Sequence, residues 1–247
     1  MKVSATLRRD PTMTKRLVKA YENDLVTILK GAKDDLRFAL TAFKGLEAEP
    51  AKVDFTSINT KIRFVLTDKV LAPASSKAKQ QLVKVQAAAK LRAEQLLKTV
   101  GITAGTGFNP AEKAIGEALI ERNIGSLKGL TDDMGKEITK ELTDGIARGE
   151  GISKLAKRID SVSDMGIERA RVIARTETLY AYNTTAKNTF RKNGIESVEW
   201  LAAYEDGRRC DQCADLNGEK FALGSEPDCP LHPQCRCTLL PVIEEAA

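Results

Sequence analysis

The sequence predicts a mainly α-helical protein with a small β-strand-and-loop module at its C-terminal end, an α+β arrangement. Two observations support this fold class. Apolar residues recur at spacings of three and four through most of residues 14–192, as they do on the buried face of a helix. All five cysteines and the only histidine lie in the last 38 residues, where short strand-like runs replace the helical spacing. We therefore expect a helical body joined to a module rich in cysteine.

Two helical stretches are expected in the N-terminal part of the chain. Thr14 to Phe43 has apolar residues at helical spacing with basic residues between them, which predicts one or two helices. A second stretch follows Pro73 and ends at Gly101, and it predicts a helix of about six turns with a start and a stop signal. The segment 101–110 is rich in glycine and ends in Asn-Pro, which is typical of a linker.

This linker divides the sequence into two expected domains, a basic helical region over residues 1–105 and a second domain over residues 106–247. The second domain is expected to be helical over 111–192 and to end in a Cys/His module over 196–243. Its helices are expected in four pieces: two separated near Gly125 to Gly129, one at 153–161, and one from Ile167 to Lys192 that stops at Asn193-Gly194. Short strands are expected at 197–204, 219–223 and 237–243.

Charge is distributed unevenly along the chain. Residues 1–100 carry 20 Lys and Arg against 10 Asp and Glu, whereas residues 101–247 carry 19 against 24. A basic half attracts phosphate or an acidic protein surface, although solvated faces of amphipathic helices explain the same pattern. The first ten residues turn charged before an apolar leader forms, and no apolar run approaches membrane-spanning length. We therefore expect a protein made and kept in a cytoplasm, with no membrane partner.

The Cys/His cluster has the spacing of a zinc site. Cys210-x-x-Cys213 turns two sulfurs toward one ion, and His232-x-x-Cys235 repeats the spacing, so these four residues form a complete tetrahedral set. Cys237 competes for the last position, because residues i and i+2 on a strand point the same way. Reduced packing cysteines and disulfides are the two alternatives to zinc.

The expected zinc site is structural rather than catalytic. Four protein ligands close the coordination sphere, whereas a catalytic zinc keeps one position open for water. The zinc-dependent deaminases place a Glu two residues after the His, and Gln234 occupies that place here. We therefore expect no enzyme, although a zinc hydrolase or nuclease with an open metal position is a conceivable third class.

Glu177 stands out on the helix that begins at Ile167. At helical spacing it falls in a stripe of small residues that includes Ala170, Ala174 and Ala181. A carboxylate on such a closely packed face needs a donor or a cation, because burying it unpaired costs several kcal/mol. We expect Glu177 to tie this helix to the segment that follows it.

Taken in order, the motifs of residues 110–243 resemble the phage head morphogenesis domain, the Mu F-like minor capsid proteins of tailed bacteriophages. The most specific part is the series of a Trp, an Asp, Cys-x-x-Cys and His-Pro-x-Cys-Arg-Cys. An Ala-Arg-Thr-Glu run precedes it on the last helix. The matched positions are Arg175, Glu177, Trp200, Asp206, Cys210, Cys213, His232, Cys235 and Cys237.

The resemblance implies a virion protein of the head and portal vertex, made in the host cytoplasm. Its implied partners are the phage portal protein and capsid proteins, and its implied role is head assembly and genome packaging or delivery. The basic half is then expected to face DNA or an acidic portal surface. The alternative is a zinc-ribbon-like nucleic-acid-binding protein, which the acidic character of the cysteine-bearing half weakens.

Overall fold

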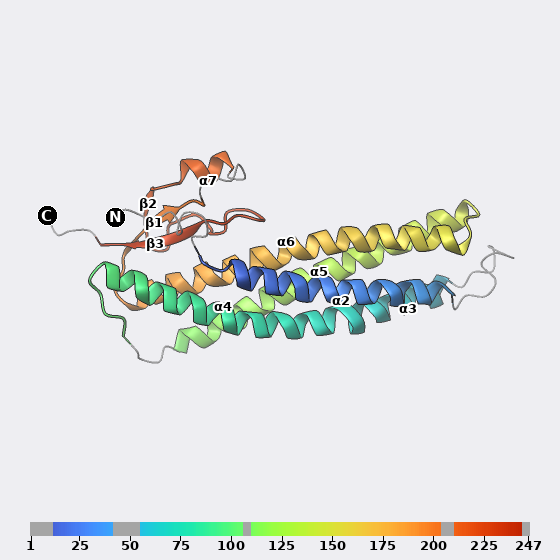
Figure 1. The fold of residues 1–247 in the computed structure, drawn as a ribbon, viewed down its shortest axis with the longest axis horizontal. Helices are drawn as coiled ribbons and strands as arrows, with labels where there is room; N and C mark the ends of the chain where they lie inside the picture. Colours follow the sequence, from blue (N-terminus) through green and yellow to red (C-terminus); the bar gives the residue numbers. More distant parts are fainter. Residues whose placement is uncertain (1–11, 42–54, 106–109, 204–209, 244–247) are drawn as a thin grey trace. The chain divides into compact units, whose positions relative to one another are not determined.

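The computed structural model describes residues 12–41, 55–105, 110–203 and 210–243 (Figure 1). Helices make up most of these residues, and a three-stranded antiparallel sheet lies near the C-terminus, so the predicted fold class is confirmed. Among the described residues, none of the helices has the length and apolar character needed to cross a membrane. The helices are α2 (Lys15–Thr41), α3 (Phe55–Phe64), the π-helix η2 (Val65–Leu71), α4 (Ala72–Thr99), α5 (Pro110–Ala147), α6 (Ile152–Lys192) and α7 (Asp211–Asp215).

The chain folds into two compact units that alternate along the sequence. The helical unit comprises residues 21–78 and 122–173. The sheet unit comprises the described residues of 1–20, 79–121 and 174–247. Helices α2, α4, α5 and α6 each contribute a segment to both units. The expected domains, 1–105 and 106–247, were placed at a break in sequence composition, whereas these units are defined by contacts between residues. The expected domains therefore stay a prediction.

The sheet has the order β2-β1-β3, formed by β1 (Ser197–Leu201), β2 (Lys220–Ala222) and β3 (Thr238–Val242). These strands lie within the three predicted segments. On β1, Val198 and Trp200 are both completely buried, and Trp200 is paired with Leu239 of β3. The same apolar core contains Ala93 of α4 and Phe190 of α6. Alternation on β1 therefore directs its largest side chain into a core shared by the sheet and helices.

Helix α6 stops where the sequence predicts, and its end positions the sheet. Gly194 has a φ of 76°, a conformation that costs glycine little because it has no Cβ. The amide of Ile195 donates to the carbonyl of Phe190 at 3.1 Å, and the amide of Gly194 donates to that of Arg191 at 3.2 Å. This is the hydrogen-bond pattern of a Schellman motif. Ile195 and Phe190 are both buried in the core, so the turn delivers the chain directly into β1.

Two predicted interruptions, near Gly125 to Gly129 and between 161 and 167, are wrong, because α5 and α6 run through them as continuous helices. The predicted break before residue 153 is confirmed, since α5 ends at Ala147 and α6 begins at Ile152. Nothing lies within 4 Å of a Cβ built on Gly125 or Gly129, so neither marks a close approach that would distort the helix. An interior glycine costs only about 1 kcal/mol relative to alanine. Burial of Leu127 and Leu130 on the same helix outweighs that cost.

Helix α6 also contains a glycine, Gly166, that packs closely against α5. A Cβ built on Gly166 would lie 2.6 Å from Sδ of Met134, which is buried on α5. A side chain at this position would require the end of the Met134 side chain to move. Helix α2, by contrast, is a single helix within the predicted range 14–43.

An ion-pair group joins α2 to α6 within the helical unit. Arg37 donates from Nε to Oδ1 of Asp160 at 2.6 Å and from Nη2 to Oδ2 at 2.5 Å, a bidentate arrangement. Lys33 lies 2.9 Å from Asp164. Basic residues of the N-terminal half are thus partly matched by acidic residues of the C-terminal half, which reduces the charge left for other partners.

The Asp160→Asn substitution is expected to destabilise the protein by about 1 kcal/mol at pH 7. The Arg37 hydrogen bonds lower the pKa of Asp160, so the folded state favours the carboxylate. A lowered pKa stabilises the fold above the unfolded value of about 3.9 and loses that effect as the pH falls through the folded value. The difference in denaturation midpoint between wild type and Asp160→Asn should therefore disappear in strong acid. Asp164→Asn, at a more exposed carboxylate, is the matched control; an equal loss in both variants would contradict this prediction.

Candidate metal centre

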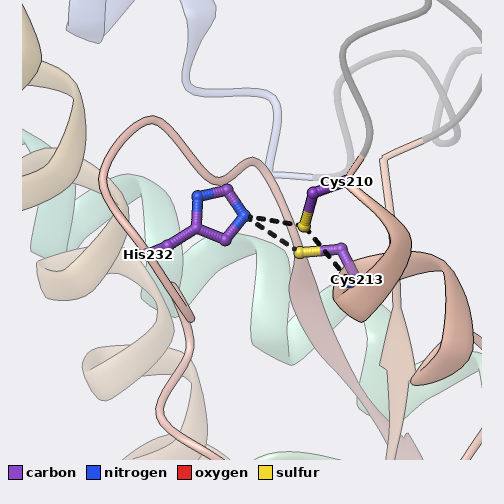
Figure 2. A group of neighbouring side chains, drawn as sticks. All are labelled: Cys210, Cys213 and His232. Carbon is purple, nitrogen blue, oxygen red and sulfur yellow. Dashed lines mark hydrogen bonds between the residues drawn. The ribbon is translucent and has the colours of Figure 1, made fainter.

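The first two candidate ligands share one turn at the start of α7. Cys210 is the N-cap residue of this helix, and its Sγ accepts a hydrogen bond from the backbone amide of Cys213 at 3.4 Å. The x-x spacing therefore brings the two sulfurs to the same side of the turn, as predicted (Figure 2). The same amide lowers the pKa of Cys210, because it stabilises the thiolate.

His232 approaches both sulfurs from a separate loop (Figure 2). Its Nε2 lies 3.2 Å from Sγ of Cys210 and 3.3 Å from Sγ of Cys213. Its Nδ1 lies 2.8 Å from the carbonyl oxygen of Pro233. Because a carbonyl oxygen only accepts, Nδ1 carries a proton, and in the neutral form of His232 the lone pair of Nε2 then faces the sulfurs. Metal-binding histidines are oriented in the same way by a hydrogen bond from the other nitrogen.

A second group of three ligands overlaps the first. Sγ atoms of Cys213, Cys235 and Cys237 lie within 4.8 Å of one another, and the Cys213–Cys235 separation is 3.8 Å. Two sulfurs bound to one tetrahedral zinc at about 2.3 Å each lie roughly 3.8 Å apart. A covalent S–S bond is about 2.05 Å long, and all five cysteines are free thiols in this structure. Cys213 belongs to both groups, and Cys229 belongs to neither.

The three thiols of the second group are buried, and two of them, Cys213 and Cys237, have a raised pKa and keep their protons. The pKa of Cys235 is lowered to about 5, mainly because the Cys237 thiol donates a hydrogen bond to its thiolate. The pKa of Cys237 is raised by the same interaction. Burial raises the pKa of Cys213 to about 12. The cluster thus holds little negative charge by itself, because burial disfavours the charged thiolate form. A divalent cation bound there would offset this effect and stabilise the thiolates.

The loop that carries Cys235 and Cys237 is fastened to α6 by Asn183. Its Nδ2 donates to the carbonyl oxygen of Cys237 at 3.1 Å, and its Oδ1 accepts from the hydroxyl of Thr238 at 2.7 Å. Asn183 is only 3 % exposed. The sequence does not reveal this role, because a buried amide on a helix has no distinctive spacing.

The Asn183→Ala substitution is expected to cost about 2 kcal/mol, because it leaves the buried Cys237 carbonyl and Thr238 hydroxyl without their partner. Chemical denaturation of the purified variant would measure the loss. Thr238→Val removes only one of the two hydrogen bonds and should cost less. Equal stability of Asn183→Ala and wild type would show that water or a rearranged loop replaces the amide.

The remaining predicted site residues have different surroundings. Trp200 is completely buried in the core that also contains Cys213, Cys235 and Cys237, and its Nε1 forms no hydrogen bond within the described residues. Glu177 is buried on α6, and the small residues of its stripe, Ala170, Ala174 and Ala181, are buried as predicted. Arg175 is half-buried and lies two residues before Glu177 on the same helix. Both residues have interaction partners. Asp206 lies outside the described residues.

Comparison with known proteins gave one family match. Residues 136–240 match the model of the family described as Phage Mu protein F like protein. The matched segment includes the second part of α5, all of α6 and every candidate metal ligand. The resemblance found by sequence analysis is thereby confirmed. No curated protein and no solved structure matched the chain.

Proposed function

Because residues 136–240 carry a Phage Mu protein F like segment, we propose that the protein is a minor capsid protein that acts in head morphogenesis of a tailed phage. The family match supports this proposal, since it covers the whole Cys/His module and the helix on which the module rests. The proposal includes a location in the virion head at the portal vertex, with the portal protein and capsid proteins as partners. It further includes support of genome packaging or delivery.

The proposed metal is a single structural zinc ion. Soft thiolates with one imidazole are the donor set that zinc prefers, and both the lone pair of His232 and the Cys213–Cys235 separation suit it. Four of the five candidates Cys210, Cys213, His232, Cys235 and Cys237 would hold the ion. When bound, the zinc would cross-link the turn before α7 to the loop of His232 and Cys235.

The proposed role of this centre is to stabilise the fold, and we propose no enzymatic activity. Cys213, Cys235 and Cys237 are each 3 % exposed or less, so substrate has little access to their side of the cluster. Asn183 fixes the same loop from within the core. Both observations favour a closed site that preserves the shape of a docking module.

Analysis of virions and of a null mutant would test the head-protein proposal. The protein should be present in purified tailed particles and in proheads, and deletion of its gene should reduce infectious particles while tails still assemble. Co-expression with the portal protein of the same phage should yield a complex that survives gel filtration. Absence from both virions and proheads would refute the proposal.

A further inference from the structure

The helical unit contains a hollow that plays no part in the candidate metal centre. It has a volume of about 880 Å³ and lies between the α3–η2 stretch and α5. Ile62, Leu66 and Gly135 are among the residues that line it. A Cβ built on Gly135 would lie only 3.3 Å from Cδ1 of Leu66, so the glycine lets α5 approach that leucine closely. The volume falls in the range of binding pockets, about 300–1,000 Å³.

The lining of this hollow is strongly biased in charge. Four cations, Arg63, Lys128, Lys136 and Lys140, line it against one carboxylate, Asp132. Both Arg63 and Lys128 are exposed, and neither forms an ion pair with another described residue. The hollow therefore presents an excess of positive charge beside an apolar floor.

Neighbouring acids compensate only part of this charge. Nζ of Lys136 lies 3.9 Å from Asp133, and Nζ of Lys140 lies 3.0 Å from Glu137. Both pairs are exposed and are three residues apart on the same helix, where such pairs contribute less than about 1 kcal/mol. Carboxylates of a ligand could therefore replace Asp133 and Glu137 as partners of these lysines at little cost in free energy.

One wall of the hollow has an unusual backbone. Leu66, Thr67 and Leu71 belong to η2, a π-helix of seven residues. The π-helix is rare, and where it occurs within helices it is frequently at a functional site. Here it buries Val65, Leu66 and Val70 while Thr67 faces the hollow. The wall is thus wider than an α-helix of the same sequence would make it.

We propose that this hollow binds an acidic amphipathic helix of a partner protein. The apolar floor would take leucine-type side chains, and the four cations would pair with flanking carboxylates, which is a known mode of helix recognition. Nucleic acid fits less well, because no aromatic side chain on which bases could stack is among the described lining residues. The inference rests on the helical unit alone and is independent of zinc and of portal association.

Fluorescence anisotropy with three synthetic peptides would test this proposal. Each peptide has about 15 residues, because a helix of that length, at about 1.5 Å per residue, spans the wall of the hollow. The first peptide has leucines on one helical face and glutamates elsewhere. The second replaces its leucines by serine, and the third replaces its glutamates by lysine. The leucine–glutamate peptide should bind the full-length protein at least about tenfold more tightly than either of the others, and salt should weaken it.

Charge reversal locates the binding surface. The double variant Arg63→Glu/Lys128→Glu should weaken binding of the leucine–glutamate peptide at least about tenfold. Lys30→Glu/Lys84→Glu makes the same change in net charge at exposed lysines that do not line the hollow, and it should change binding less than about twofold. Circular dichroism would confirm that both variants fold. Equal loss in the two variants, equal binding of the three peptides, or tighter binding of an oligonucleotide at the same residues would overturn the proposal.

Discussion

The Cys213→Ser substitution is expected to abolish metal binding. Cys213 is the one residue that belongs to both three-ligand groups, so neither group keeps three ligands without it. Protein purified without chelator should contain about one zinc per wild-type chain and almost none in the variant. The thermal midpoint should fall by about 10 °C or more, since the loss of a tightly bound metal removes several kcal/mol.

Three further variants make this experiment decisive. Cys229→Ser alters a buried cysteine outside both groups and should keep its zinc. Cys235→Ser and Cys237→Ser, compared with each other, should show which of the two completes the set, because only the ligand should release the metal. Wild-type protein without metal and with fewer than five titratable thiols would instead show that disulfides cross-link the module.

The Trp200→Ala substitution is expected to destabilise the protein by about 3–5 kcal/mol, the range for large aromatic side chains in a core. Trp200 is completely buried and packs in the core that joins the sheet, α4, α6 and four buried cysteines. The cavity would open in the core that also contains Cys213, Cys235 and Cys237, so zinc affinity should fall together with stability. Chemical denaturation and competition with a zinc-binding dye would measure the two effects.

Trp200→Phe is the informative comparison. The Nε1 of Trp200 makes no hydrogen bond within the described residues, so phenylalanine removes volume but no polar interaction. Its cost should stay near about 1–2 kcal/mol, and zinc affinity should remain close to wild type. If the phenylalanine variant were as unstable as the alanine variant, the indole nitrogen would have a hydrogen-bond partner outside the described residues.

Sequence alone was sufficient for the features that depend on local chemistry. The strand-like run that follows Asn193-Gly194 predicted β1, Gly101 and Gly194 predicted two helix ends, and Cys-x-x-Cys predicted a pair of sulfurs on one turn. Each depends on neighbours within a few residues, where spacing and backbone preference decide the outcome. The strands, the helix ends and the grouping of the candidate ligands therefore follow from the sequence.

Features that depend on distant packing could not be predicted. Gly125 and Gly129 are stop signals by composition, yet burial along α5 keeps the helix continuous. The α3–η2 stretch and the two-unit arrangement were not predicted, since both depend on which helices lie together. Spacing also left Cys235 and Cys237 as alternatives, and the structure keeps both beside Cys213 because they follow each other on one loop fastened by Asn183.

The interleaving of the two units determines how the protein can be shortened. A fragment that starts at residue 106 would retain every candidate metal ligand and all of the family match. It would nevertheless lack Val85, Ala89 and Leu97, which are completely buried in the same core as Trp200. Such a fragment would expose that apolar face to solvent and should aggregate on expression. Biochemical work on the module therefore requires a chain that still contains α4.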